Sequence, residues 1–156
     1  MNLSEQLVKH LKEVHFGGNW TWVNMKDTLA DVTWQQATAK VGSLNTIAAL
    51  TFHINYFVAV VIKALTEQVL DGNDKLSFDH PAIDGPEDWD AMRNKLLADA
   101  ETFAALILKI PEEQLGDIFF QEKYGTYFRN IVGIIEHTHY HMGQIVIIKK
   151  IFPPHA

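Results

Sequence analysis

The apolar and polar positions of the chain follow helical spacing over most of its length. From residue 4 to residue 15, apolar side chains fall on one side of a helix and charged side chains on the others. Gly17 and Gly18 break this rhythm, and it resumes from Met25 to Val32. The pattern therefore predicts a first helix that is interrupted or kinked near the two glycines.

Two tryptophans, Trp20 and Trp22, lie in this break. They could line the mouth of a ligand pocket, but tryptophan more often buries its large apolar area in a core. The core placement is therefore favoured for both. Trp34, further along the chain, is predicted to lie in the core.

A second helix is predicted to begin at Ile47. The preceding residues, Ser43 to Thr46, are mostly polar types suited to helix capping. Apolar residues then recur at three-to-four spacing: Ile47, Leu50, Ile54, Phe57, Val60, Val61 and Ala64. His53 lies on this apolar stripe. The stretch from Ile47 to Leu65 is long enough to suggest a membrane helix, but polar residues interrupt it, so a buried bundle helix is the prediction.

Two more helices complete the pattern. Residues 71–86 are rich in Asp, Gly and Pro and predict a surface connection over one end of the bundle. Pro86 suits the first turn of a third helix, which Pro111 ends. Thr126 is a candidate cap for the last helix, from Tyr127 to about Ile151, which Pro153 and Pro154 stop. Together these elements predict an all-α, four-helix bundle with residues 1–156 in a single domain.

The last helix carries the stretch with the clearest chemistry. His137 and His141 are four residues apart, so on a helix they differ by about 40° in direction and roughly 6 Å in height and can reach one metal ion. His139 points about 200° away from His137 and is left out of the site. The pair lies on an apolar stripe with Ile134 and Ile145, where an unpaired imidazole would be unfavourable by about 1 to 3 kcal/mol.

This spacing alone also fits two ordinary histidines with hydrogen-bond partners. A third ligand would favour metal binding, and His53 is the candidate because it is also on a core-facing stripe. A single histidine at such a position is more often a satisfied core residue. Three imidazoles would suit zinc or nickel and would leave a coordination position open for water or a substrate.

Composition narrows the class of function. The formal net charge is −6 and no basic cluster occurs, which argues against a nucleic-acid partner. The chain has no cysteine, so any thiol chemistry needs an external thiol. The N-terminus has neither the basic region nor the apolar core of a signal peptide, and a cytoplasmic location is therefore expected, with no membrane partner.

Three stretches together resemble the DinB-like superfamily, also called YfiT-like metal-dependent hydrolases. They are Phe16-Gly17-Gly18-Asn19-Trp20, Ser43-Leu44-Asn45-Thr46-Ile47, and the terminal His137-x3-His141-x-Gly143-Gln144. The resemblance implies a bundle in up-down-down-up order, often a homodimer, that binds zinc, nickel or a similar ion. One histidine comes from the second helix and two from the fourth, positions that His53, His137 and His141 match.

The resemblance also implies a range of reactions. Members with assigned roles include transferases that use low-molecular-weight thiols such as bacillithiol, and mycothiol-dependent isomerases. We therefore expect a metal-dependent S-transferase of the bacillithiol or glutathione type, or a hydrolase, acting on a small molecule. The alternative is a non-catalytic dimeric bundle in which the ion joins two helices and the function is partner binding or stress response.

Four further residues are candidates for the site. Gln144, three residues after His141, could orient a ligand or a bound water, and an ordinary hydrogen bond between helices is the competing role. Asn19, Trp20 and Tyr56 are candidates for the border of a substrate cavity.

Overall fold

The computed structural model describes residues 1–152, and Pro153 and Pro154 lie outside them. The described chain is all-helical, as predicted, and has an isolated β-bridge between Ile118 and Thr126 but no strand. The α-helices are α1 (Leu3–Phe16), α2 (Met25–Ala30), α3 (Trp34–Thr38), α4 (Ile47–Glu67), α5 (Pro86–Ile107) and α6 (Tyr127–Ile151). Three short 3-10 helices are η1 (Asp74–Leu76), η2 (Glu112–Gly116) and η3 (Glu122–Tyr124).

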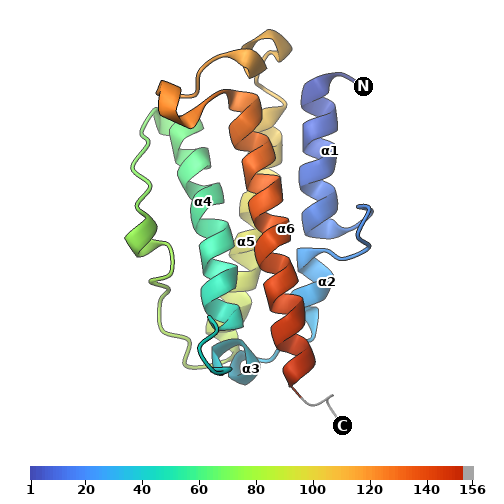
Figure 1. Cartoon of the computed structure of the whole chain (residues 1–156), viewed down its shortest axis with the longest axis vertical. Coiled ribbons are helices and arrows are strands. Elements are labelled where there is room, and N and C mark those ends of the chain that lie inside the picture. The colour runs from blue at the N-terminus through green and yellow to red at the C-terminus, as the bar shows by residue number, and fades with distance from the viewer. Residues whose placement is uncertain (153–156) are drawn as a thin grey trace.

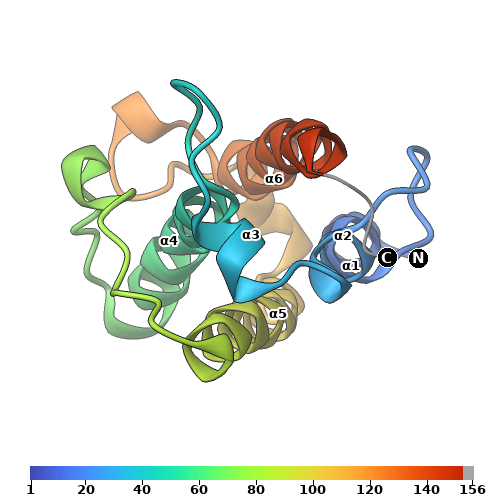
Figure 2. The ribbon, with the colours of Figure 1, turned by 90° about the horizontal axis from the view of Figure 1, so that it is seen from below.

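The four long helices, α1, α4, α5 and α6, lie side by side as a bundle (Figure 1). α1 and α6 run in one direction, and α4 and α5 run in the other. The connection from α4 to α5 returns along the outside of the bundle, so these two consecutive helices are parallel. Seen from below, α3 lies across one end of the bundle, where it packs on α4 and α5 (Figure 2).

Local sequence fixes where the long helices begin. The Thr46 hydroxyl accepts a hydrogen bond from the backbone N–H of Ala49 at 3.1 Å, and Thr126 does the same for Arg129 at 3.1 Å. Each satisfies one of the N–H groups that have no partner inside the helix. Pro86 occupies the first turn of α5, where its missing N–H has no cost. The predicted starts of α4, α5 and α6 are therefore confirmed.

The core of the bundle consists of two apolar clusters stacked along the helix axes. One includes Met25, Ile47, Leu50, Trp89 and Ile145. The other includes Leu7, Val58, Phe103, Ile107 and Ile131. The histidines of α4 and α6 lie where the two clusters meet, because His53 lies between Leu50 and Val58 along α4.

Two predictions about helix boundaries need correction. The predicted interruption at the two glycines is present, since α1 ends at Phe16 and α2 begins at Met25, but α2 ends at Ala30 and a further short helix, α3, follows it. Gly17 and Gly18 have φ angles of +113° and +98°, values open to glycine, and they turn the chain away from the α1 axis. α5 ends at Ile107 rather than at Pro111, and η2 follows it.

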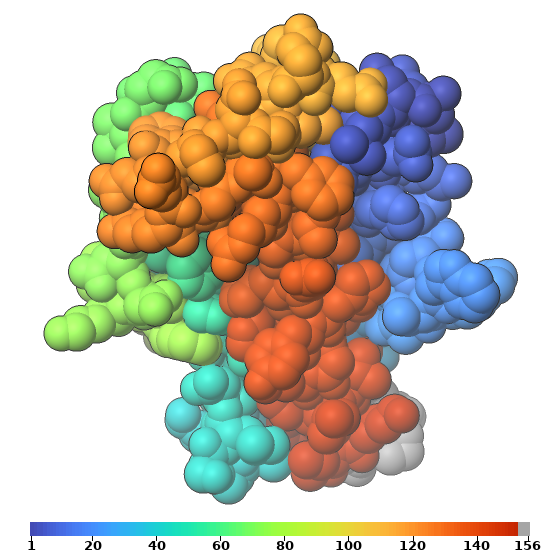
Figure 3. Space-filling view, turned by 45° about the horizontal axis from the view of Figure 1, so that its top comes forward, coloured from blue at the N-terminus to red at the C-terminus, as the bar shows by residue number. Residues whose placement is uncertain are grey.

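The predicted core placement of Trp20 and Trp22 is wrong. Their side chains are 96% and 90% exposed, on a loop that projects from the side of the molecule (Figure 3). The Asn19 amide fixes the loop by donating to the carbonyl oxygens of Glu13 at 2.9 Å and Val23 at 2.7 Å. The loop geometry, rather than the apolar character of the rings, therefore decides where they lie. Trp34, by contrast, packs against the core.

α4 is long and apolar enough to span a membrane when length and composition are the sole criteria. In the bundle, 56% of its most apolar window is buried. Core helices of soluble proteins meet the same criteria.

Candidate metal centre

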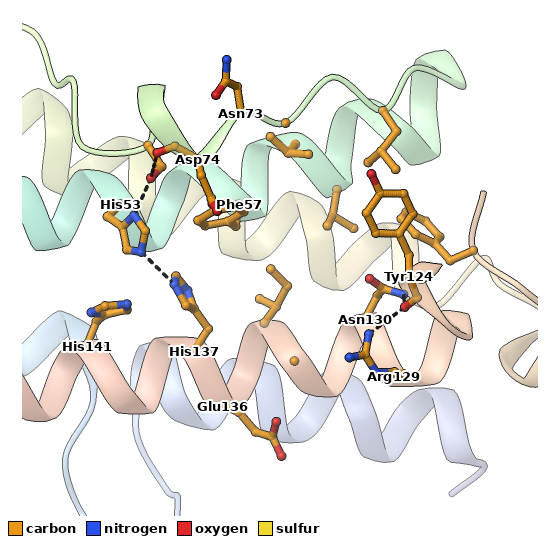
Figure 4. Close-up of a pocket in the computed structure, with 18 of the residues that line it drawn as sticks. His53, Phe57, Asn73, Asp74, Tyr124, Arg129, Asn130, Glu136, His137 and His141 are labelled. Carbon is orange, nitrogen blue, oxygen red and sulfur yellow. Dashed lines mark hydrogen bonds between the residues drawn. The ribbon is translucent and has the colours of Figure 1, made fainter. Parts of the chain in front are cut away.

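Three histidines from two helices converge at the seam between α4 and α6 (Figure 4). His53 comes from the middle of α4, and His137 and His141 come from consecutive turns of α6. One ring nitrogen from each lies within 4.8 Å of the others. The ring centroids form a nearly equilateral triangle, with separations of 4.8, 4.6 and 4.5 Å. The predicted convergence is confirmed.

The orientation of the His53 ring is set by a buried serine. The Ser77 hydroxyl donates to the carbonyl oxygen of Asp74 at 2.8 Å, and its oxygen lies 2.9 Å from His53 Nδ1. Since the hydroxyl proton is already used, Ser77 accepts from His53 Nδ1–H. The proton is then on Nδ1, and the lone pair of Nε2 points towards the other histidines.

His141 is oriented in the same way by Gln144. The Gln144 Oε1 atom lies 2.8 Å from His141 Nδ1, so it accepts the Nδ1 proton and leaves a lone pair on Nε2. Gln144 is thus placed where it can orient a ligand, as the sequence suggested.

His137 differs from the other two histidines. Its Nε2 lies 3.0 Å from His53 Nε2, and its Nδ1 is buried without a hydrogen-bond partner. Because His53 Nε2 carries a lone pair, His137 Nε2–H is the donor of this hydrogen bond. Burial, followed by the neighbouring His141 and His53, lowers the pKa of His137 to about 4. Burial and His141 also lower the pKa of His53. Both rings are therefore neutral at pH 7, the form that binds metal.

The donor set fits a divalent metal ion. Imidazole nitrogens bind zinc at about 2.0–2.1 Å, which places two ligands of a tetrahedral ion about 3.3 Å apart. The His53–His137 pair, at 3.0 Å, is close to this separation. The ligand nitrogens of the three histidines lie up to 4.8 Å apart, which exceeds the separation expected around a tetrahedral zinc ion by about 1.5 Å. Rotation of the side chains has to close that difference when an ion binds.

Aromatic rings form one wall of the centre. Phe78 stacks on His53 with a centroid distance of 3.9 Å and an angle of 9°. Phe57 presents its edge to both His53 and His137, at 5.2 Å from each. These rings restrict how the imidazoles can turn, and both also line the cavity beside the histidines.

The metal centre opens into a cavity of about 1370 Å³. In Figure 3 the surface is hollowed between α6 and the connection that precedes α5. The cavity runs from the three histidines along α6 towards Tyr124, Arg129 and Asn130 (Figure 4). Its middle is lined mainly by apolar side chains from α4, α6 and the connections: Phe57, Val60, Val61, Leu70, Phe119 and Ile134.

Asn19, Trp20 and Tyr56, the candidates for the border of a substrate cavity, do not line the cavity beside the histidines. Asn19 and Trp20 line a separate, smaller hollow beside α1, together with His139. The Tyr56 hydroxyl accepts a hydrogen bond from the Asn73 backbone N–H at 2.9 Å, and Tyr56 is not among the residues that line the large cavity. His139 lies outside the cluster, as its direction on the helix predicted.

The connection between α4 and α5 does more than link two helices. Ser77 and Phe78 both contact His53, although the sequence identified this segment as a surface connection alone. No local pattern signals these contacts, because they depend on the path of the connection back along α4.

The protein is therefore a helical bundle with a candidate metal site. This class follows from the order of the helices, the three convergent histidines and the adjoining cavity. Comparisons of the chain with protein-family models, with curated proteins and with solved structures give no match.

Proposed function

We propose that the chain is a metal-dependent enzyme of the DinB-like type that acts on a small molecule. The reaction would be transfer to or from a low-molecular-weight thiol of the bacillithiol or glutathione type, or hydrolysis. The observation that supports it best is the position of the three histidines, which form the end wall of a large open cavity. An ion that served to join helices alone would need no such cavity.

A bound zinc or nickel ion would supply Lewis acidity that lowers the pKa of a water or thiol and holds the resulting anion beside an electrophile. The chain's own residues supply the rest. His53, His137 and His141 would hold the ion, with Ser77 and Gln144 fixing two of the rings. Because the sequence contains no cysteine, the sulfur nucleophile of a transferase would have to come from an external thiol.

Two further features support the DinB-like assignment. The three histidines come from the second and fourth long helices, and the direction of the long helices reverses after α1 and again after α5. The proposal includes a cytoplasmic homodimer, and sedimentation velocity on the full chain would measure its oligomeric state.

The first test is metal analysis of protein purified without an affinity tag, before and after dialysis against a chelator. The enzyme proposal expects about one ion per chain and a chelated protein that stays folded but loses turnover on a panel of thiol-acceptor pairs and esters. Protein that binds no stoichiometric metal would refute it. Unfolding on chelation, with no turnover by the metal-loaded protein, would instead favour the bundle in which the ion joins α4 to α6.

A further inference from the structure

The end of the cavity farthest from the histidines contains a cationic group. Arg129, Asn130 and Tyr124 lie there, around the start of α6 (Figure 4). Arg129 and His137 are eight residues apart on α6, so their backbones are separated by about 12 Å along one face of the helix. The two ends of the cavity thus carry different chemistry at a fixed distance.

Arg129 is held in place by the chain around it. Its Nη1 donates to the carbonyl oxygen of Tyr124 at 2.8 Å, and the amide of Asn130 donates to the same oxygen at 3.0 Å. Its aliphatic stem crosses Gly125, where an added Cβ would lie 2.7 Å from Arg129 Cδ. Gly125 also has a φ angle of +73°. Glycine is therefore needed there both for the turn and for the seat of the arginine.

The remaining guanidinium donors have no acidic partner within residues 1–152. Asp71, also on the cavity wall, forms its ion pair with Lys63. Asp74 is at the histidine end, and the Glu136 carboxylate points away from the histidines (Figure 4). Arg129 is the one lysine or arginine side chain that lines the cavity in the described part of the chain. An arginine fixed in this way is suited to binding a carboxylate through two parallel hydrogen bonds.

A glycine of α6 lies on the cavity floor between the two ends. Gly133 lies one turn from both Arg129 and His137 on α6 and lines the cavity. A Cβ added there would meet no atom within 4 Å. Glycine is unfavourable in the interior of a helix, so its position here favours a role in leaving room along the cavity floor.

We propose that this site binds an elongated molecule with a carboxylate at one end and the reacting group at the other. Arg129 binds the carboxylate, the apolar middle of the cavity covers the chain between the two groups, and the reacting group lies at His53, His137 and His141. This inference rests on the proposed function, and it narrows the substrate class to molecules with an anionic group remote from the reacting atom.

The test uses the full-length protein loaded with Co²⁺, titrated with ω-mercapto acids while the thiolate-to-cobalt absorption is followed. The probes are 8-mercaptooctanoate, the short 3-mercaptopropionate, and the neutral 8-mercaptooctanol. We expect 8-mercaptooctanoate to bind at least about tenfold more tightly than either of the other two, because it alone combines the length to reach Arg129 with a carboxylate for the arginine to bind. In Arg129→Gln its advantage over 8-mercaptooctanol should shrink to about twofold or less.

A pair of glycine variants tests the path between the ends. Gly133→Leu fills the cavity floor and should weaken 8-mercaptooctanoate at least tenfold while 3-mercaptopropionate still gives the absorption band. Gly143→Leu is the matched control: Gly143 is on the same helix, is exposed, lines neither hollow, and would also meet nothing within 4 Å. It should leave all three affinities unchanged. Thermal unfolding of both variants checks that the helix is intact.

The outcomes separate this inference from the proposed function. If the thiols bind cobalt with equal affinity regardless of length and charge, or if Arg129→Gln changes nothing, the carboxylate site is refuted and the metal-dependent enzyme stands. If Gly133→Leu binds 8-mercaptooctanoate as well as Gly143→Leu does, the proposed path is wrong. If the protein binds no Co²⁺, or if no thiol produces the band, the thiol-dependent proposal itself fails.

Discussion

Each histidine of the cluster has a distinct electrostatic setting, although all three are the same residue type. His53 and His141 each donate one ring proton to a side-chain oxygen, whereas His137 has a buried nitrogen without a partner. A divalent ion would replace the direct contact between His137 and His53: it would bind the lone pair of His53 Nε2, and it would bind His137 Nε2 once the ring proton has moved to the unpartnered Nδ1. His53 and His141 are therefore already oriented to bind an ion, whereas His137 lacks a hydrogen-bond partner that would orient its ring.

Replacing any one ligand should release the metal. We expect His53→Ala, His137→Ala and His141→Ala each to weaken binding more than about 100-fold, because two imidazoles hold a divalent ion far less tightly than three. Mass spectrometry of metal content and competition with a chromogenic chelator would measure this. His139→Ala is the control on the same helix and should keep its metal. Retention of stoichiometric metal by all three ligand variants would show that the ion binds elsewhere.

Ser77 should influence affinity without touching the ion. Ser77→Ala removes the acceptor that fixes the His53 ring, and we expect metal affinity to fall about 10- to 100-fold. Ser4→Ala is a matched control, since Ser4 is also buried and donates to the carbonyl oxygen of Ile110, far from the site along the chain. Equal affinities for the two variants would remove Ser77 from the metal centre.

The elements show where local sequence controls the structure and where it does not. Caps at Thr46 and Thr126 begin α4 and α6 at the predicted residues, since a cap is a contact between near neighbours in the chain. The loop with Trp20 and Trp22 could not be placed in this way. Its path depends on two glycine φ angles and on hydrogen bonds from Asn19, which the hydrophobic pattern does not encode.

The cap of α4 should have a measurable effect on stability. Thr46→Ala leaves the Ala49 N–H without its side-chain acceptor, and we expect the free energy of unfolding to fall by about 1 kcal/mol in urea titrations. Thr66→Ala, in the last turn of the same helix, is the control. The exposed Thr66 hydroxyl donates a hydrogen bond to the Ile62 carbonyl oxygen, and the loss of this hydroxyl should change the free energy of unfolding by less than about 0.5 kcal/mol. Equal losses for the two variants would argue against a stabilising cap.

For the whole molecule, buried neutral histidines couple folding to pH. His15 is fully buried in α1, where its Nδ1–H donates to the Leu11 carbonyl oxygen at 2.8 Å and its Nε2 has no partner. Burial lowers the pKa of His15, and burial likewise lowers the pKa of His53, His137 and His139. In the unfolded chain these groups have a pKa of about 6.5.

The metal-free protein should therefore lose stability in mild acid. Below pH 6.5 the unfolded chain binds more protons than the folded chain. The contribution of these histidines to the free energy of unfolding is therefore fully present above pH 6.5 and falls as the pH is lowered. For His137 the loss continues to about pH 4. Each group contributes at most about 1.4 kcal/mol per pH unit. Urea titrations in the presence of EDTA at several pH values would measure the slope.

A pair of variants assigns part of this slope. His15→Gln should flatten it whatever the absolute stability of the variant, and Val14→Ala, which is also fully buried in α1 but removes no titrating group, should leave it unchanged. A slope that is equal in the wild type and in His15→Gln would show that His15 does not contribute.

The sequence by itself determined the helical class, the starts of α4, α5 and α6, and the core-facing stripes of the two helices on which His53, His137 and His141 lie. Each of these depends on spacing within one helix or on a contact between near neighbours, and both are written in local order. The tertiary structure alone decided the contacts of Ser77 and Phe78 with His53, the exposure of Trp20 and Trp22, and the cavity that joins the histidines to Arg129. These features depend on how segments distant in the chain pack together, and residue type and helical spacing do not specify that packing.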